Sequence, residues 1–395
     1  MAKKRGAMWE IRKEMTALQA KGLFRSLTTV EGTQSTTIER DGKRFLLFCS
    51  NNYLGLANHP RLKASAISAI KTGGVGAGAS RLISGNSALY TRLETRLAEF
   101  KSTESALVFS SGYTANIGAL CALAQKNDLI LSDRLNHASL VDGARLSGAL
   151  FRVYRHKDMA QLKKILSNRR KNQNALIVTD GIFSMEGDIA PLSEIFALAE
   201  DYGAFIYLDD AHATGVLGPQ GRGTPAHFNL KSGRIIQMGT LSKAIGGVGG
   251  FIAGDNLLIQ YLINKARPFI YTTALAPASL ASALAALTLI EEESGLIQQL
   301  WKNTHYFRRK VLELGFNIGA SETPIVPLLI GESEKAVTFS RKLLDHGIYI
   351  PAIRPPSVPK GSSRLRVSLM ATHTQEEIDT LLSALEKLGK ELRLI

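Results

Sequence analysis

Short β-like runs recur through the middle of the chain, and each is followed by a longer stretch with apolar residues at helical spacing. The short runs lie at 106–109, 129–131, 175–179, 205–208 and 234–238. Strands that are buried on both faces of a parallel sheet are apolar at almost every position, whereas amphipathic helices show the longer period. The alternation from about residue 46 to 275 therefore predicts an α/β fold, with a mostly parallel sheet covered on both faces.

The two ends of the chain follow other patterns. Residues 8–23 predict an amphipathic helix, whose apolar positions are Trp9, Ile11, Met15, Leu18 and Leu23. A long helical run extends from about 278 to 312, and β-like runs such as 325–330 then alternate with helices. We therefore expect an N-terminal helical and extended segment, a large domain and a smaller C-terminal α+β domain. Their expected bounds are 1–45, 46–277 and 278–395.

Composition limits the class of protein. A chain of 395 residues with 45% hydrophobic residues can bury a large core, which excludes disordered and fibrous classes. Its two cysteines, Cys49 and Cys121, provide neither a disulfide framework nor metal-ligand spacing, so we expect no metal site and a reducing cytoplasm. The N-terminus lacks the apolar core of a signal peptide, and no uncharged apolar run reaches about 18 residues, so no membrane span is predicted.

The formal net charge of +14 favours anionic partners, such as coenzyme A, an acidic carrier protein or nucleic acid. A nucleic-acid-binding protein should gather its basic residues into a patch within a known binding module. Here they form only small clusters, at 3–5 and 163–171. A solvated surface explains these clusters more simply, and we expect no nucleic-acid partner.

Lys243 is the first candidate for chemistry. It lies between small hydroxyl residues and a glycine cluster at 246–250, directly after the run 234–238. A desolvated lysine at a strand end can lose its proton and attack a carbonyl to form a Schiff base. Lysines are common, and a surface lysine beside a flexible loop would show the same local pattern.

Asp209 is the second candidate, because it ends the apolar run 205–208, and α/β folds bind ligands at the carboxyl ends of their strands. Pyridoxal phosphate requires a lysine and an acid that keeps its pyridine nitrogen protonated, and Lys243 with Asp209 meets both needs. The segments 209–215 (Asp-Asp-Ala-His-Ala-Thr-Gly) and 240–244 (Thr-Leu-Ser-Lys-Ala) resemble those of the α-oxoamine synthases. These enzymes are fold-type I pyridoxal-phosphate transferases.

The resemblance implies a set of cofactor contacts. The strand-to-helix join at 106–113 resembles the family's phosphate site, where exposed N–H groups at a helix start bind phosphate. His137 matches the histidine that stacks on the pyridine ring, and His212 the contact to the phenolic oxygen. Lys243, His137 and Asp209 are the implied catalytic residues. The implied cofactor-binding residues are Gly112, Tyr113, His137, Ser184, Asp209, His212, Thr240 and Lys243, with Thr272 and Thr273 serving a neighbouring subunit in a homodimer.

One expected carboxylate differs from the family pattern, because Asp180 stands where the family usually has Glu, and its role stays open. The glycine-rich stretch 73–79 follows a helix rather than a strand, so it does not predict a dinucleotide site. Implied substrate contacts are Arg25, Asn51, His137, Arg354, Ser357 and Arg366, with Arg366 holding the amino-acid carboxylate.

The cofactor chemistry alone does not choose between transamination and attack on a thioester. The segment 352–359 (Ala-Ile-Arg-Pro-Pro-Ser-Val-Pro) resembles the branch of the family that condenses L-alanine with a pimeloyl thioester, although Ser357 replaces its usual Thr. The acyl carrier, coenzyme A or acyl carrier protein, stays open. The alternatives are another α-oxoamine synthase with a different acyl or amino donor, and a non-enzymatic basic scaffold or RNA-binding protein that kept the fold.

Overall fold

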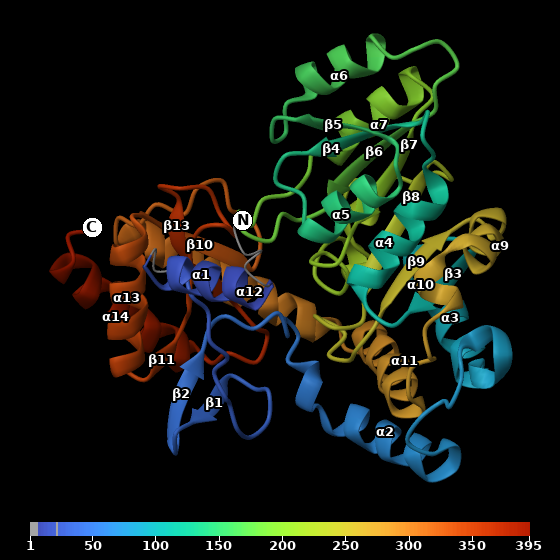
Figure 1. Cartoon of the computed structure of the whole chain (residues 1–395). Helices are drawn as coiled ribbons and strands as arrows, with labels where there is room; N and C mark the ends of the chain where they lie inside the picture. Colours follow the sequence, from blue (N-terminus) through green and yellow to red (C-terminus); the bar gives the residue numbers. More distant parts are fainter. Residues whose placement is uncertain (1–6, 21–22) are drawn as a thin grey trace.

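The computed structural model describes residues 7–20 and 23–395 and is built around a seven-stranded sheet (Figure 1). The strand order is β3-β9-β8-β7-β6-β4-β5, and only β9 runs antiparallel to its neighbours. This confirms the predicted α/β fold with a mostly parallel sheet. The strands are β3 (Ser105–Phe109), β4 (Leu129–Asp133), β5 (Leu150–Tyr154), β6 (Ala175–Asp180), β7 (Phe205–Asp209), β8 (Ile235–Thr240) and β9 (Gly250–Gly254).

Helices cover both faces of this sheet, which explains why its central strands are apolar throughout. Ile130 of β4 faces one helical layer and the next residue, Leu131, faces the other, because successive side chains point to opposite faces. The first layer contains α4 (Gly112–Leu123), α5 (Ala138–Leu146), α9 (Asn256–Lys265) and α10 (Arg267–Ile270). The second contains α6 (Met159–Ser167) and α7 (Leu192–Asp201).

The C-terminal region has its own sheet, of order β10-β13-β12. Its elements are β10 (Ile325–Gly331), α13 (Ser333–Asp345), β12 (Ala352–Ile353), β13 (Ser363–Ser368) and α14 (Gln375–Glu391). The helical run predicted from 278 to 312 is two helices, α11 (Pro277–Glu292) and α12 (Ser294–Glu313), which meet at Glu293. Glu293 has φ −112° and ψ 69°, so the backbone turns there, and the predicted helical run is confirmed with a break at this residue. Helix α11 packs on α2 (Pro60–Gly73) and α3 (Ala88–Lys101).

The N-terminal region is tied to the C-terminal one through a second three-stranded sheet. Strands β1 (Thr37–Arg40) and β2 (Lys43–Leu47) pair with each other, and β2 pairs in parallel with β11 (Ile348–Tyr349). The boundary expected at residue 45 therefore falls inside β2. The three expected segments remain a proposal about domain organisation.

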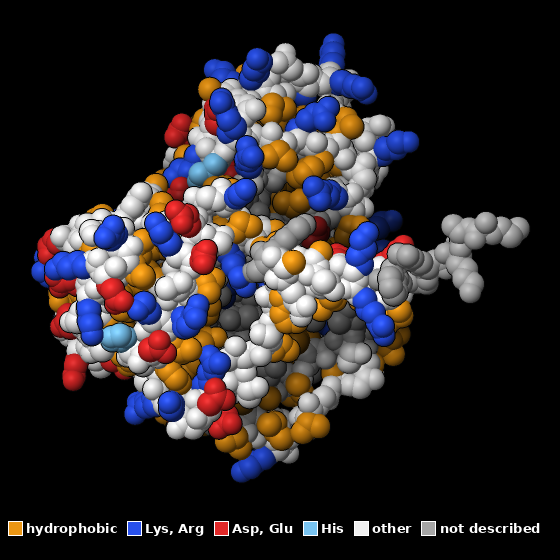
Figure 2. Space-filling model, turned by 60° about the vertical axis from the view of Figure 1, so that its left-hand side comes forward, with side chains coloured by type: hydrophobic (Ala, Val, Ile, Leu, Met, Phe, Trp, Pro, Cys, Tyr) orange, Lys and Arg blue, Asp and Glu red, His pale blue; other side chains and the backbone are white. Residues whose placement is uncertain are grey.

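The N-terminal helix α1 (Ala7–Ala20) leaves three of its apolar side chains largely exposed. Met8, Ile11 and Met15 are 67%, 50% and 41% exposed. The side chain of Trp9, residues 21 and 22 and the basic cluster at 3–5 lie outside the part of the chain that is described. None of the helices in the described ranges is both long and apolar enough to cross a bilayer. On the face in Figure 2, Lys and Arg side chains are scattered over the whole surface.

A buried ion pair holds the turn that follows β7. The ammonium group of Lys101 lies 2.6 Å from Asp210 Oδ2, and neither side chain is exposed to solvent. Lys101 also donates to the carbonyl of Arg222, at 2.7 Å, and Asp210 accepts the hydroxyl of Thr224, at 2.6 Å. The two adjacent aspartates thus have different partners. Asp210 stabilises the buried turn, and Asp209 takes no part in this ion pair.

The buried pair gives a stability prediction. Lys101→Met should destabilise the protein by about 3–5 kcal/mol, because it leaves the Asp210 carboxylate buried without a cation. Urea unfolding would measure the loss. Lys163→Met on the exposed side of α6 is the control and should change stability by less than about 0.5 kcal/mol. A loss below about 1 kcal/mol for Lys101→Met would contradict the role of the pair.

Candidate active site

Lys243 lies in a tight loop directly after β8. The backbone closes this loop with hydrogen bonds from Leu241 N to Gly249 O and from Gly247 N to Leu241 O, at 2.9 and 2.7 Å. Gly246 has φ +75°, and a side chain there would meet the backbone of Ala57 at 2.6 Å. Only glycine fits at this position, so the glycine cluster gives the lysine loop its shape.

The Lys243 amine loses its proton more readily than an ordinary lysine. Burial lowers its pKa from 10.5 to about 8, although the carboxylates of Asp209 and Asp180 oppose the shift. Lys243 Nζ lies 3.0 Å from His212 Nε2. Burial, and then the charges of Lys243 and Arg366, lower the pKa of His212 well below 6.5, so this imidazole is neutral. The hydrogen-bond partner of the Lys243 amine is therefore neutral and adds no negative charge that would raise its pKa.

A chain of hydrogen bonds continues from His212 to a buried arginine. Tyr53 bonds to His212 Nδ1 through its hydroxyl, at 2.7 Å, and Arg366 Nη2 donates to the same hydroxyl, at 3.3 Å. Arg366 also donates to Asn51 Oδ1 at 3.1 Å and to the carbonyl of Ser184 at 2.5 Å. Within the described chain Arg366 has no carboxylate partner, and only 7% of it is exposed. A buried guanidinium without an anion is suited to a carboxylate ligand.

Two carboxylates lie side by side at the carboxyl ends of β6 and β7. Asp180 and Asp209 are paired in the register of these strands, and both are buried. Asp209 accepts hydrogen bonds from Asn116 Nδ2, at 2.7 Å, and from the backbone of Ala211, at 3.0 Å. Burial, followed by the Asp209 charge, raises the pKa of Asp180 well above 3.8. Asp180 itself accepts the backbone N–H of His137, at 2.7 Å.

His137 caps the start of α5 and faces the same region. Its Nδ1 lies 2.7 Å from the hydroxyl of Ser139, and its ring stands edge-on to Tyr113, with centroids 6.4 Å apart. Desolvation lowers the pKa of His137 despite the Asp209 charge, and the charge of Lys243 lowers it further. A neutral aromatic ring fits the stacking role that the sequence predicts.

The start of α4 provides an anion site. Ser111 and Thr114 form a capping box, while the backbone N–H groups of Gly112 and Tyr113 have no acceptor within the described chain. A side chain on Gly112 would approach Thr240 Oγ1 to 3.6 Å, so Thr240 lies next to this helix start. The Thr240 hydroxyl donates to the carbonyl of Gly249, at 2.8 Å, and so also supports the lysine loop.

These groups fit pyridoxal phosphate. Free N–H groups at a helix start suit its phosphate, a lysine of lowered pKa suits its aldehyde, and the charged Asp209 suits its ring nitrogen. Gly112, Tyr113, Thr240, His137, Asp209, His212 and Lys243 would hold it. Ser184 accepts a hydrogen bond from Arg366 through its carbonyl, and its hydroxyl has no hydrogen-bond partner within the described chain.

A second cluster brings together three predicted substrate residues that are far apart in the sequence. Arg25 donates to the hydroxyl of Ser357, at 3.1 Å, and Arg354 donates to the carbonyl of Phe24, at 3.3 Å. All of them line one cavity of about 350 Å³. Two arginines at a cavity suit an anionic substrate group.

Thr272 and Thr273 lie away from these contacts. Thr273 forms an isolated bridge with Ser80, and no partner for either hydroxyl is found among the described residues. The segment is fixed by the hydrogen bond from Leu275 N to the hydroxyl of Tyr90, at 2.6 Å. This placement leaves both threonines free for another molecule.

Sequence reasoning missed the contributions of Tyr53 and Asn116, and it left Asp180 open. Tyr53 belongs to the segment 50–56 (Ser-Asn-Asn-Tyr-Leu-Gly-Leu), which resembles a family motif and could have indicated it. Asn116 bridges Asp209 and the hydroxyl of Ser139, and its amide oxygen accepts the Tyr207 hydroxyl at 2.9 Å. Nothing in the local pattern marks Asn116, because its role arises from three segments that meet only in the fold.

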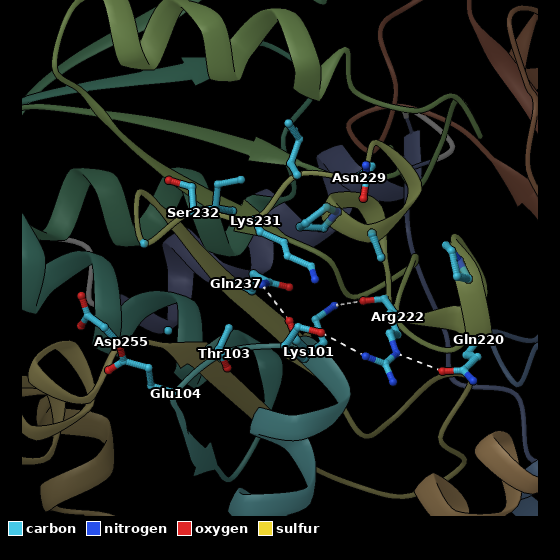
Figure 3. Close-up of a pocket in the computed structure, with 18 residues that line it drawn as sticks. Lys101, Thr103, Glu104, Gln220, Arg222, Asn229, Lys231, Ser232, Gln237 and Asp255 are labelled. Atoms are coloured by element: carbon cyan, nitrogen blue, oxygen red, sulfur yellow. Dashed lines mark hydrogen bonds between the residues drawn. The ribbon is translucent and has the colours of Figure 1, made fainter.

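Another cavity, of about 520 Å³, lies at the amino ends of β3 and β8 (Figure 3). Lys243 follows the carboxyl end of β8, at the opposite edge of the sheet. It also contains a lysine, Lys101, whose partners are Asp210 and the carbonyl of Arg222. Gln237 donates to the carbonyl of Lys101, at 3.3 Å. An ion-paired, fully bonded ammonium is not a nucleophile, so this lysine does not compete with Lys243 as the reactive amine.

The chain is similar to known proteins over nearly its whole length. The model of the aminotransferase class I and II family matches residues 43–385. An 8-amino-7-oxononanoate synthase of Thermoanaerobacter pseudethanolicus is 50% identical over 386 residues, which cover 98% of each chain. One of Geotalea daltonii is 51% identical over 382 residues, covering 96% of this chain and 97% of the relative.

Solved structures show the same fold. A serine palmitoyltransferase from S. paucimobilis has a TM-score of 0.94 at 31% identity, covering 99% of this chain and 100% of the other. An 8-amino-7-oxononanoate synthase from Francisella tularensis has a TM-score of 0.76 at 28% identity, covering 88% of this chain and 98% of that one.

The lowered pKa of Lys243 gives a direct prediction. In protein stripped of cofactor, reductive methylation of Lys243 should rise with pH through about 8, since only the neutral amine reacts. Exposed Lys265 on α9 is the control, because its side chain is solvated whereas that of Lys243 is buried. Peptide mass spectrometry across a pH series would measure both. Equal midpoints for the two lysines would contradict the proposed desolvation.

Proposed function

The chain belongs to the aminotransferase class I and II family, and from this premise we propose that it condenses L-alanine with a pimeloyl thioester to give 8-amino-7-oxononanoate. A carbon–carbon bond forms between alanine Cα and the thioester carbonyl, the thiol leaves, and the alanine carboxyl group departs as CO2. The observation that carries this proposal is the hydrogen-bond chain Lys243–His212–Tyr53–Arg366. It links a reactive amine to a guanidinium that has no carboxylate partner within the described chain.

Each residue of the site has a task in this reaction. Pyridoxal phosphate, when bound, withdraws electrons from the Cα of the amino acid and makes its proton acidic. Lys243 Nζ, with its pKa near 8, accepts and returns protons at that carbon. Asp209 keeps the ring nitrogen protonated, and Asn116 and the backbone of Ala211 hold its two carboxylate oxygens.

Arg366 is the residue that we assign to the alanine carboxylate. Its Nε and Nη1 groups are held by the Ser184 carbonyl and the Ser368 hydroxyl, which orients the guanidinium. His212 stays neutral and so adds no competing cation next to the amino group. We assign the distal carboxylate of the pimeloyl group to the cavity of Arg25, Arg354 and Ser357.

Two kinds of relative suggest different substrates. Serine palmitoyltransferases match the backbone closely but at 31% identity, whereas 8-amino-7-oxononanoate synthases reach 50% over almost the whole chain. Backbone similarity reports the shared fold, while substrate choice depends on the side chains of the site. The arginine-bearing segment 352–359 and its contact with Arg25 support a dicarboxylic acyl group over a long apolar one.

We further propose that the active unit is a homodimer in the cytoplasm, and both coenzyme A and acyl carrier protein remain candidate carriers. Large apolar side chains are exposed on two adjoining segments, which the bridge between Ser80 and Thr273 holds together. Val75 and Ile83 are each 81% exposed, and Tyr271 is 71% exposed. A second copy of the chain would cover them and bring Thr272 and Thr273 to its partner's phosphate site.

The activity has a simple test. Purified protein loaded with pyridoxal phosphate, incubated with L-alanine and pimeloyl-CoA, should release thiol and CO2 and give a product with the mass of 8-amino-7-oxononanoate. Lys243→Ala should abolish the product, and Lys265→Ala is the matched surface control. Product from palmitoyl-CoA with serine, and none from the proposed pair, would identify the alternative member of the family.

The dimer gives a separate prediction. Wild type should sediment as a dimer, and Ile83→Glu should shift it towards monomer, because a charge would be buried in the interface. Activity should fall with the dimer fraction. Leu312→Glu, at an apolar residue of α12 that is 52% exposed, is the control. A fully active monomer at assay concentration would overturn the proposal.

A further inference from the structure

The loop at 181–190, here called the joint loop, connects the large sheet with the C-terminal sheet. It closes on itself through a bridge between Ile182 and Ile189 and starts at the end of β6. From the C-terminal side, Arg366 donates to the carbonyl of Ser184, and Arg364 donates to the carbonyl of Met185, at 2.5 and 3.0 Å. The joint loop therefore holds the arginine that we assign to the amino-acid carboxylate.

Further contacts press the joint loop against β10. Thr323 donates to the carbonyl of Gly187 at 2.8 Å, and Ile189 N donates to Glu322 Oε1 at 3.0 Å. Gly187 has φ +72°, and a side chain there would lie 2.0 Å from the carbonyl oxygen of Ile325. This approach tolerates only glycine, so a small shift of the joint loop changes several contacts with the C-terminal sheet together.

On its other side the joint loop is anchored by His156. His156 Nε2 lies 3.0 Å from Asp188 Oδ2, and its Nδ1 lies 3.0 Å from Asp133 Oδ1. Its ring also stands edge-on to Phe183 of the joint loop, with centroids 4.4 Å apart. Asp133 ends β4 and accepts the backbone N–H of Leu135 at 2.9 Å, two residues before His137. One imidazole thus spans the loop that carries His137 and the loop that orients Arg366.

The charges around His156 favour its doubly protonated form. Only an imidazolium can donate to Asp133 and Asp188 at the same time. Lys157 also donates to Asp188 Oδ2, at 3.1 Å, and Glu186 of the joint loop is paired with Arg364. The other oxygen of Asp188 is buried and has no partner within the described chain. Without the cation of His156, the Asp188 carboxylate would keep Lys157 alone.

We propose that His156 is a positioning residue for the amino-acid substrate: its two hydrogen bonds fix the joint loop, and the joint loop fixes Arg366. This inference rests on the proposed function, because it concerns the arginine assigned to the carboxylate of alanine. The side chains of Arg25 and Ser357 bond to each other, and neither of them forms a hydrogen bond to the joint loop within the described chain. Loss of His156 should therefore impair alanine binding much more than binding of the acyl thioester.

The same geometry makes the effect dependent on pH. Burial alone would lower the pKa of His156, but its hydrogen bonds to Asp133 and Asp188 and their charges raise it from 6.5 to about 9. Because the folded-state pKa is the higher one, the contribution is complete below about pH 6.5 and is lost as the pH rises through about 9. Glu186 and Lys157 are the other charged groups that face this site.

The test compares His156→Gln with wild type, using steady-state kinetics with L-alanine and pimeloyl-CoA. Gln can donate to only one of the two carboxylates and carries no charge. Near pH 7 the KM for alanine should rise roughly 5- to 30-fold, while the KM for the thioester changes less than about 2-fold. The ratio of the two alanine KM values, variant over wild type, should fall towards 1 as the pH rises past about 9. Because the titration of alanine and of Lys243 affects the KM of both proteins alike, this ratio removes its contribution.

His305→Gln, at an exposed histidine of α12, is the matched control and should behave as wild type. A wild type without alanine-dependent thiol release would contradict the proposed function itself. An active wild type with an alanine KM ratio near 1 at every pH would overturn the role of His156, as would equal losses for both substrates.

A second measurement needs no variant. In cofactor-loaded wild type with labelled histidines, nuclear magnetic resonance should show one of the 8 histidines titrating near pH 9. If every histidine that titrates does so below about pH 7.5, His156 is not a fixed cation between the two carboxylates, and the proposal fails.

Discussion

The parallel pairing of β6, β7 and β8 is the constraint on which the rest of the site depends. Because the three strands run in the same direction and in register, their carboxyl ends meet at one edge of the sheet. Asp180 and Asp209 lie side by side there, and the lysine loop follows from β8. Any slip in this pairing would separate the anion from the amine, and so the chemistry depends on the backbone hydrogen bonds of the sheet.

The site then balances its charges by burial. Two adjacent carboxylates cannot both stay ionised in a desolvated place, and Asp180 is the one whose pKa rises, while Asp209 receives the hydrogen bonds that favour its charged form. The same desolvation lowers the pKa of Lys243 to about 8 and that of His212 well below 6.5. Arg366 keeps its charge and has no anion of its own in the described chain. The described site therefore has a cation without an anion, and the carboxylate of the proposed amino-acid substrate would balance it.

Two sets of contacts, one in the core of the large domain and one with the C-terminal sheet, hold this edge of the sheet in place. Lys101 and Asp210 fix the turn after β7 from within the core. The joint loop connects β13 with the large sheet through its hydrogen bond from Arg366. His156 links that loop to the end of β4. Charged residues that stabilise the fold thus lie next to charged residues of the site on the same loops. Asp209 and Asp210, for example, are neighbours in sequence with separate roles.

The sequence by itself determined the α/β fold and the mostly parallel sheet, because apolar strands alternating with amphipathic helices leave a pattern that is local in the chain. Its motifs, which are also local, determined the family. It also indicated Asp209 and Lys243, since one ends a β-like run and the other lies in the loop after the next, whereas His137 was implied by the family resemblance. Their roles, and those of the other predicted contacts, stay predictions. Only the tertiary structure decided that the helical run near 293 breaks, that α1 leaves Met8 and Ile11 exposed, and that Arg25 meets Ser357. It likewise decided which groups surround Lys243 and His156, because a pKa depends on distances between segments that the chain separates by many residues.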